Sequence, residues 1–422
     1  MEEAIKFTKG NKAYINIFNN IYEKYKKHGK ITGQFIVEGK TDDEKRALQN
    51  FDLEVVSTGK AKITSKKVEA LYIKRFGAID FMKLIETVVG ENLITNKEIL
   101  LSKKDRRESF FSEILESAED GIGKWWFENI IKEKSSGYRS IIMIYSDIDN
   151  SELIIRLIRF INIVNKLPYL SGNFESIVLF SANKTRDPHF FDLDRFEGKL
   201  LINALANILE KPQPMDIVET NELYYLVGLL KNEISNTTTI YGLKAYKERK
   251  EVKSISEFNL WNEPLEISIS NILNIDQFKP IGENIYIFEN PTVFHEVLKS
   301  VKGKTSLICT KGQLNLSSHL IIQRLIDAKN IYYAGDFDPE GLAIANNIRN
   351  KYGERIKFLL YEKKYYENIK SNIRLEESRI NKLDKVNIEE LKEIKNCIIK
   401  EKYSAYQELL IKDYIDFIII NM

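Results

Sequence analysis

Apolar residues recur with two different periods in the last third of the chain. Short apolar runs rich in β-branched and aromatic residues predict strands at 285–289, 306–310, 330–338 and 356–361. Between these runs, apolar positions three and four residues apart predict helices at 292–301, 315–328 and 339–352. Strands that alternate with helices of this length are typical of a parallel sheet flanked by helices. We therefore predict an α/β fold, with this sheet in a C-terminal domain of residues 265–422.

The remainder of the chain has a different pattern. Residues 1–90 predict an α+β region, with helices at 11–27 and 42–50 and strands at 34–37, 53–58 and 61–64. This order is compatible with a winged-helix-like unit that binds DNA or a partner protein. Residues 91–253 are predicted to be mainly helical, with Trp125 and Trp126 in the core, a break at 212–214 and a strand at 141–152. The charged stretch 362–401 has heptad-like apolar spacing and predicts a helical pair beside the sheet.

Acidic residues stand where two of the predicted C-terminal strands end. Asp336 and Asp338 are two residues apart, so on a strand their side chains share one face. Two such charges about 4 Å apart repel by ~4 kcal/mol at an effective dielectric near 20, so the pair needs a divalent cation or a shared proton. Glu289 ends a neighbouring strand at the same edge of the sheet, where ligands bind in open α/β folds. Oxygen-only ligands favour Mg²⁺ or Mn²⁺ over zinc. The stretch is also compatible with a polar loop before a helix that starts at Pro339.

An acid after the first strand and Asp-x-Asp-x-x-Gly after the third resembles the Toprim domain of topoisomerases, primases and nucleases. Several stretches resemble, more narrowly, the nuclease subunit family (JetD) of Wadjet anti-plasmid systems, in the variant with Glu-Asn-Pro in place of Glu-Gly: FENPTVFHEV, LICTKGQLN, YYAGDFDPEGLAIAN and YQELLIKDYI. Two upstream stretches resemble the N-terminal region of that variant: RDPHFFDLDRFEGKLLINALA and YYLVGLLKNEISNTTTIYGL. The similarity is dense over 283–353 and thin before residue 178.

This resemblance implies a metal-dependent DNA endonuclease that hydrolyses phosphodiester bonds of circular plasmid DNA. It implies a homodimer acting with an SMC-type ATPase complex and its kleisin-type subunits. Asp336 and Asp338 are the expected ligands of Mg²⁺ or Mn²⁺, and Glu289 is the expected third ligand or general base. Glu340 is an expected further acid of the site, and Gly341 is expected to let its helix pack closely.

Weaker candidates surround this set. Lys311 and Gly312 follow the strand at 306–310 and are candidates for donating to a phosphate. Glu408, after Gln407, is a candidate extra acid, although an exposed helix position explains it equally well. His295 and His319 are predicted to be surface or hydrogen-bonded residues without a chemical role. Candidate DNA-binding stretches are the basic segments 24–30, 103–107 and 244–253.

A second, N-terminal site of the same kind is not expected. Glu38, within FIVEGKTD, and the Asp147/Asp149 pair have the same residue types, but 109 positions separate Glu38 from Asp147, against 47 between Glu289 and Asp336. We interpret the segment after Glu38 as a helix start, with Thr41 and Glu44 forming a capping box.

Composition limits the remaining possibilities. The 422 residues carry 63 Lys and Arg against 61 Asp and Glu, so a DNA-binding face must be a local patch. Two cysteines and four histidines argue against a disulfide scaffold or a zinc cluster. Neither a signal-like segment nor an apolar run of about 18 residues occurs, which favours a cytoplasmic protein without a membrane anchor.

Other classes of function stay open beside the nuclease. One is an enzyme like type IIB topoisomerases or the meiotic strand-break protein, which uses a tyrosine nucleophile; with 21 tyrosines the composition allows it. Another is a non-catalytic DNA-binding subunit whose acids hold a structural ion.

Overall fold

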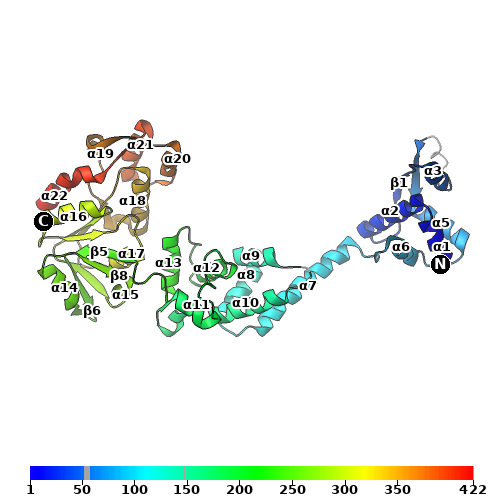
Figure 1. Cartoon of the computed structure of the whole chain (residues 1–422), viewed down its shortest axis with the longest axis horizontal. Coiled ribbons are helices and arrows are strands. Elements are labelled where there is room, and N and C mark those ends of the chain that lie inside the picture. Colours follow the sequence, from blue (N-terminus) through cyan, green and yellow to red (C-terminus); the bar gives the residue numbers. More distant parts are fainter. Residues whose placement is uncertain (52–57, 147, 422) are drawn as a thin grey trace. The chain divides into compact units, whose positions relative to one another are not determined.

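The computed structural model describes residues 1–51, 58–146 and 148–421 (Figure 1). These residues fall into two compact units, one of residues 1–119 and 141–161 and the other of residues 120–140 and 162 onward. The structure is a mixed α/β fold with a helix-flanked C-terminal sheet and a largely helical N-terminal region, as predicted. The expected boundaries at residues 90 and 253 do not coincide with those of the units. None of the described helices is both long and apolar enough to cross a membrane.

The first unit begins with two helices and a strand pair. Its elements to residue 117 are α1 (Glu2–Lys9), α2 (Lys12–His28), β1 (Gln34–Glu38), α3 (Asp42–Gln49), β2 (Lys60–Thr64), α5 (Ser65–Phe76), α6 (Phe81–Val89) and α7 (Asn96–Ser117). The predicted helices and the strands at 34–37 and 61–64 are confirmed, whereas most of the predicted strand at 53–58 lies outside the described residues. Buried apolar side chains of α1, α2, α5 and α6 form the core of this unit.

The segment after Glu38 starts a helix, as interpreted. Glu38 lies opposite Lys60 in an antiparallel pair, not at the end of a parallel strand. The Thr41 hydroxyl accepts from the Glu44 backbone N–H over 3.2 Å, which confirms the helix cap. The Glu44 carboxylate, however, accepts from the backbone N–H of Lys40 and not of Thr41. Asp147 lies outside the described residues.

Helices continue from there to the sheet: α8 (Ile122–Glu133), α9 (Ser136–Ile144), α10 (Ser151–Val164), α11 (Ile177–Thr185), α12 (Phe196–Ile208) and α13 (Ile217–Leu226). The predicted strand at 141–152 is wrong, because residues as far as Ile144 are helical. Trp126 is fully buried as predicted and donates to the Asn203 side chain, but Trp125 is 44% exposed. The break at 212–214 is confirmed.

Six described strands form the C-terminal sheet, in the order β13-β12-β10-β11-β5-β8. Their bounds are β5 (Thr237–Tyr241), β8 (Leu265–Ser268), β10 (Asn284–Phe288), β11 (Ser306–Cys309), β12 (Asn330–Ala334) and β13 (Ile356–Phe358). The four predicted strands pair in parallel, as expected. β5 and β8 add an antiparallel edge that was not predicted. The sheet is therefore mixed, and it begins inside the region predicted to be mainly helical.

Helices α16 (Pro291–Val301), α17 (Leu316–Arg324) and α18 (Pro339–Tyr352) connect the parallel strands as predicted. α16 packs against the last helix, α22 (Ile411–Ile420), beside it in Figure 1. Residues 285–288 of β10 are fully buried, as expected for a central parallel strand covered on both faces. Smaller strands β6 (Leu243–Lys247), β7 (Lys250–Glu251) and β9 (Gln277–Pro280) form a ribbon, and α14 (Lys253–Leu260) and α15 (Ile269–Ile272) complete this part.

The predicted helical pair at 362–401 is only partly correct. This stretch forms α19 (Lys363–Ile369), β14 (Lys370–Arg374), α20 (Glu377–Ile380), two short 3-10 turns, η3 (Asn381–Lys385) and η4 (Glu389–Leu391), and α21 (Lys392–Glu401). β14 pairs with β15 (Tyr403–Ala405), and the 3-10 turn η5 (Gln407–Leu410) follows. Pairing with a strand outside the stretch breaks the helical pattern that its apolar spacing suggested.

Candidate functional site

The order of the strands creates a topological switch point at one edge of the sheet. β10 and β12 are parallel neighbours whose last residues, Phe288 and Ala334, lie side by side. The chain leaves β10 toward β11 on one side and leaves β12 toward β13 on the other. Such a switch point, at the carboxyl ends of parallel strands, is where ligands bind in open α/β sheets. Glu289 follows β10 directly and Asp336 lies two residues after the end of β12, so both stand at this switch point.

Glu289 is held in place by its backbone. Its N–H donates to the carbonyl of Ala334 over 3.1 Å, and its own carbonyl accepts from Gly312 N–H over 3.0 Å. The Tyr333 hydroxyl donates to Glu289 Oε2 over 3.3 Å. Burial, followed by repulsion from Asp336, raises the pKa of Glu289 to about 7. The carboxyl is therefore close to half-protonated at neutral pH.

Gly335 leaves the space that the Glu289 carboxylate occupies. A Cβ atom at this position would lie 2.6 Å from Glu289 Oε2 and 2.9 Å from the hydroxyls of Tyr333 and Tyr361. Any side chain here would therefore displace the carboxylate. Gly341 has a comparable role, as expected, because its Cβ would lie 2.3 Å from the carbonyl oxygen of Asp336.

Asp336 is bound by a segment far along the chain. Its Oδ1 accepts from the backbone N–H of Gln407 over 3.0 Å. Burial raises the pKa of Asp336 to about 6; repulsion from Glu408 and Asp338 adds to the rise, which the Gln407 N–H partly offsets. Paired backbone hydrogen bonds between Phe337 and Ala405, 2.9 and 3.0 Å long, fix this segment against the motif.

Gln407 and Glu408 both lie at the site, although the sequence left their position open. Gln407 is fully buried; its side-chain amide lies close enough to Asp336 to lower the pKa of that carboxyl, but neither polar atom of the amide makes a hydrogen bond of ordinary geometry within the described residues. Glu408 Oε1 accepts from the Asn290 side chain over 2.6 Å, which links this turn to the residue after Glu289. A buried amide without partners is costly unless a ligand or ordered water satisfies it.

Asp338 and Glu340 are engaged differently from Glu289 and Asp336. Asp338 Oδ1 caps α18 by accepting from Gly341 N–H over 2.7 Å, and Oδ2 accepts from Arg379 Nη2 over 2.7 Å. Glu340 accepts from Arg379 and from Lys382, and its pKa falls to about 2, chiefly through the hydrogen bond from Arg379. Arg379 was not among the predicted site residues, because one basic residue in a highly charged stretch has no distinguishing sequence signal.

Lys311 and Gly312 have partners in this structure. The Lys311 ammonium binds the Glu266 carboxylate at 2.5 Å, and the N–H of Gly312 donates to the Glu289 carbonyl. Gly312 thus positions Glu289, and a role for either residue in phosphate binding stays a prediction.

Carboxylate oxygens are suitable ligands for a divalent cation, but the acids at this site are not arranged as a ligand shell. Among the described residues, no group of three His, Cys, Asp or Glu side chains is placed to hold a metal ion. At this site Asp338 uses one oxygen for the helix cap and the other for Arg379. Glu289 and Asp336, in contrast, repel each other, and the buried Gln407 amide lacks partners. A cation with bound water would reduce the repulsion between the two carboxylates and would give the Gln407 amide hydrogen-bond partners.

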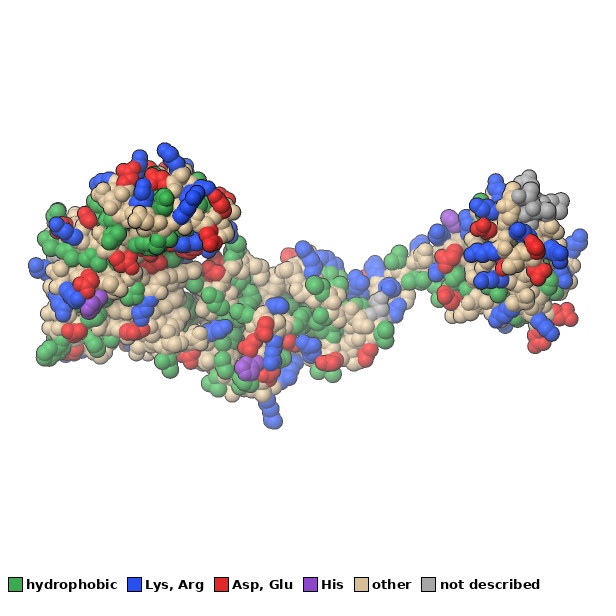
Figure 2. Space-filling view, turned by 45° about the horizontal axis from the view of Figure 1, so that its top comes forward, with side chains coloured by type: hydrophobic (Ala, Val, Ile, Leu, Met, Phe, Trp, Pro, Cys, Tyr) green, Lys and Arg blue, Asp and Glu red, His purple; other side chains and the backbone are tan. Residues whose placement is uncertain are grey.

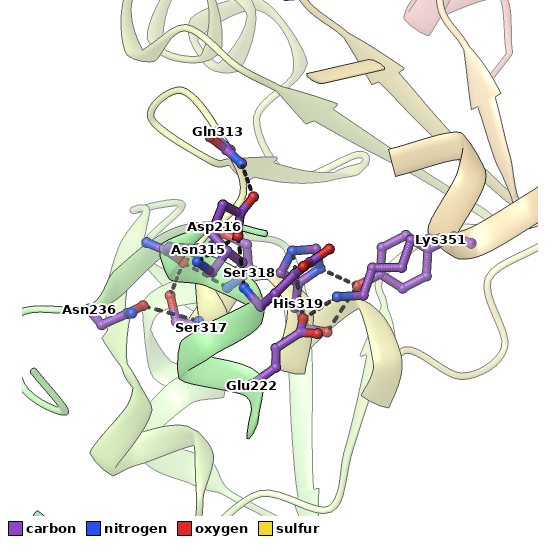
Figure 3. Close-up of polar contacts among 12 residues, drawn as sticks. Asp216, Glu222, Asn236, Gln313, Asn315, Ser317, Ser318, His319 and Lys351 are labelled. Carbon is purple, nitrogen blue, oxygen red and sulfur yellow. Dashed lines mark hydrogen bonds and ion pairs between the residues drawn. The ribbon is translucent and has the colours of Figure 1, made fainter. Parts of the chain in front are cut away.

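A second polar cluster lies beside the loop that follows β11 (Figure 3). Gln313 on this loop donates to Asp216, at the start of α13, over 3.4 Å. A cavity of about 670 Å³ is lined here by Asp216, Glu222, Gln313, His319, Lys351 and Lys385, among others. Within this cavity the Glu222 carboxylate pairs with the Lys351 ammonium.

His319 has a structural place in this cluster. Its Nδ1 shares a 2.6 Å hydrogen bond with the Tyr352 hydroxyl, and its ring is buried. Burial, with a contribution from Lys351, lowers the pKa of His319 to about 3. The ring is therefore neutral and forms no ion pair with Glu222, 4.0 Å away. His295 is exposed. His319 is thus a hydrogen-bonded residue and His295 a surface residue, as predicted.

The basic stretches are largely exposed on α2, on α7 and on the ribbon that β6 and β7 form. On the face shown in Figure 2, Lys and Arg side chains alternate with Asp and Glu. The surface view thus agrees with the small net charge, and it does not distinguish one stretch as a DNA-binding face.

Comparison with family models matches two parts of the chain. Residues 266–418 match the family described as "Protein of unknown function C-terminus (DUF2399)". Residues 31–245 match the family described as "Protein of unknown function N-terminus (DUF3323)". No curated protein matches the chain. The second family model covers 215 of the 422 residues, and the chain therefore belongs to the DUF3323 family.

Proposed function

We propose that this protein is a Mg²⁺- or Mn²⁺-dependent DNA endonuclease of the Toprim type. The observation that carries the proposal is the meeting of Glu289 and Asp336 at the switch point of the sheet, with both pKa values raised. Strongly perturbed carboxyl groups at such a switch point are typical of functional sites. The unpartnered Gln407 amide at the same place supports a ligand there.

The residues have separable roles in this proposal. Asp336, oriented by the Gln407 N–H, is a cation ligand, and Asp338 is the second once its Oδ2 is released. Glu289, with a pKa of about 7, can accept a proton from the attacking water at neutral pH. When bound, the cation would polarise the phosphodiester and stabilise the charge that develops on its oxygens. Gln407 would orient water through its amide.

A tyrosine nucleophile finds no support in the tyrosines beside the acids. Tyr333 is fully buried and Tyr361 is 7% exposed. Burial raises the pKa of both hydroxyls well above the ordinary value, whereas a nucleophile is activated by a lowered pKa or an adjacent base. Hydrolysis by an activated water molecule therefore fits the residues at this switch point better than attack by a tyrosine.

The substrate and partners follow from the resemblance to the Wadjet nuclease family. We propose circular double-stranded DNA as the substrate, and a homodimer that acts with an SMC-type ATPase complex and its kleisin-type subunits. The test is therefore run with the chain alone and with its ATPase partners present.

The experiment measures Mn²⁺-dependent nicking of supercoiled plasmid by the parent and by Asp336→Asn. Loss of cleavage in the variant, by at least about 100-fold, is expected for a lost cation ligand. Asp327→Asn is the matched control, because this exposed aspartate precedes β12 at the opposite end of the strand. Cleavage that survives Asp336→Asn or chelation of metal would contradict the proposal. A covalent protein–DNA adduct trapped by denaturant would instead favour the topoisomerase-like alternative.

A further inference from the structure

The carboxylate of Asp338 is paired with a basic side chain of the protein, Arg379. Its Oδ2 lies 2.7 Å from Arg379 Nη2, in a side chain that is 12% exposed, while Oδ1 caps α18. Neither Glu289 nor Asp336 has a comparable basic partner among their described contacts. The acids at the switch point therefore form two groups. Glu289 and Asp336 repel each other, whereas the charge of Asp338 is neutralised by Arg379.

The guanidinium of Arg379 is also bound by a second carboxylate, that of Glu340. Arg379 Nε donates to both oxygens of Glu340, at 3.2 and 3.1 Å, and Nη2 donates to Glu340 Oε2 at 2.6 Å. This fork-on-carboxylate geometry is the strongest arrangement available to an arginine. Arg379 thus bridges Glu340 and Asp338 and does not sample the surface freely.

The segment that carries Arg379 is itself anchored. α20 and η3 pack against α18, the helix that starts at Asp338 (Figure 1). Ile380 and Leu383 of this segment are buried, and Asn346 on α18 accepts from the N–H groups of Asn387 and Ile388. The position of Arg379 is therefore a property of the fold.

We propose that Arg379 is an internal counter-ion that competes with the divalent cation for Asp338. This inference rests on the proposed function. A carboxylate oxygen bound to a guanidinium cannot accept a divalent cation without bringing two positive groups together, and these repel. Binding of the cation through Asp338 therefore requires the guanidinium to leave Oδ2. Glu340, which holds Arg379 through Nε as well as through the shared Nη2, retains it nearby in both states.

The competition assigns Arg379 a positioning role that a purely structural ion pair would not have. In the cation-free protein it neutralises Asp338 and sets the concentration of cation needed to fill the site. Removing it should therefore strengthen cation binding, whereas removing a residue that merely supports the fold should weaken it.

The test is a titration of Mn²⁺, without DNA, into the full-length parent, Arg379→Gln and Lys382→Gln. Electron paramagnetic resonance of the free ion measures the dissociation constant of each protein for Mn²⁺. Arg379→Gln is expected to lower the dissociation constant about tenfold, the worth of one charge-assisted hydrogen bond. Lys382→Gln is the matched control, because Lys382 lies on the same segment and contacts Glu340 but not Asp338. It is expected to change the constant by no more than about twofold.

Further variants distinguish a failure of the proposed Arg379 competition from a failure of the metal assignment. Arg379→Lys keeps the charge and should fall between the parent and Arg379→Gln, and thermal unfolding checks that each variant is folded. Unchanged or weaker Mn²⁺ binding in Arg379→Gln would overturn the competition, as would absence of binding in every variant. Adding Asp336→Asn should abolish Mn²⁺ binding in parent and variant alike. Binding that persists in Asp336→Asn would overturn the metal assignment of the proposed function instead.

Discussion

The backbone N–H of Gln407 donates to Asp336 Oδ1 over 3.0 Å, which joins residues 71 positions apart into one corner of the candidate site. The contact explains how the turn η5 reaches the acids that follow β10 and β12. It also places the unpartnered side-chain amide of Gln407 next to carboxyl groups whose pKa values are raised. A buried polar group left without a partner in the ligand-free protein is a specific feature that substitution can test.

Gln407→Leu should stabilise the cation-free protein and weaken its function. Replacing the buried amide by an apolar side chain of similar size removes an unsatisfied group, worth about 1 kcal/mol of unfolding free energy. If the amide orients cation-bound water, Mn²⁺ binding should weaken about tenfold or more. Denaturant unfolding in chelator and Mn²⁺ titration measure the two effects. A variant that is less stable in chelator would contradict this account of Gln407.

The stability of the cation-free protein should fall as pH rises from about 5.5 to 8. The pKa values of Glu289 and Asp336 are raised to about 7 and about 6, so the folded state favours their protonated forms. That contribution is complete below the ordinary carboxyl pKa and is lost as pH passes through 6 and 7. Thermal unfolding in chelator should show a drop of roughly 2–6 °C.

The double variant Glu289→Gln, Asp336→Asn should remove much of this drop, because neither neutral side chain titrates. Asp327→Asn, which alters an exposed carboxylate elsewhere, should leave the pH dependence of the parent intact. Adding Mn²⁺ to the parent at pH 8 should restore stability. An equally steep pH dependence in the double variant would place its origin in other groups.

Gly335→Ala should disrupt the site more than its small size suggests. The added Cβ would lie 2.6 Å from Glu289 Oε2, so the carboxylate must move. We expect a loss of about 1–3 kcal/mol in stability and at least tenfold weaker Mn²⁺ binding or cleavage. Gly282→Ala is the comparison, because its Cβ would make only an ordinary contact at 3.5 Å. Normal Mn²⁺ binding and cleavage by Gly335→Ala would show that the position of Glu289 is unimportant.

Tyr352→Phe should affect stability but not cleavage. The change leaves the buried Nδ1 of His319 without its 2.6 Å partner, at a cost of about 1–2 kcal/mol. Thermal unfolding and the plasmid assay test the two statements, with Tyr332→Phe as a phenol outside this cluster. Lost cleavage in a folded Tyr352→Phe protein would give the His319 cluster a functional role that we do not assign.

Much of the C-terminal fold is predictable because its signals are local. The spacing of apolar residues identifies β10 to β13 and the helices between them, and α18 has its predicted ends at Pro339 and Tyr352. Asp338 caps that helix, and proline is favoured at its first position. The meeting of Glu289 with Asp336 also follows from the linear order, because parallel strands bring their carboxyl ends to one edge.

Features that depend on distant partners were not predictable in the same way. β5 and β8 complete the sheet from a region that reads as helical or irregular, and β14 interrupts a stretch with helical spacing because β15 pairs with it. Arg379 has no distinguishing sequence signal, yet folding places it on Asp338. Periodicity records which face of an element is apolar. It does not record which element that face will meet, because hydrogen bonds and ion pairs between distant residues exist only once the sheet order has been set.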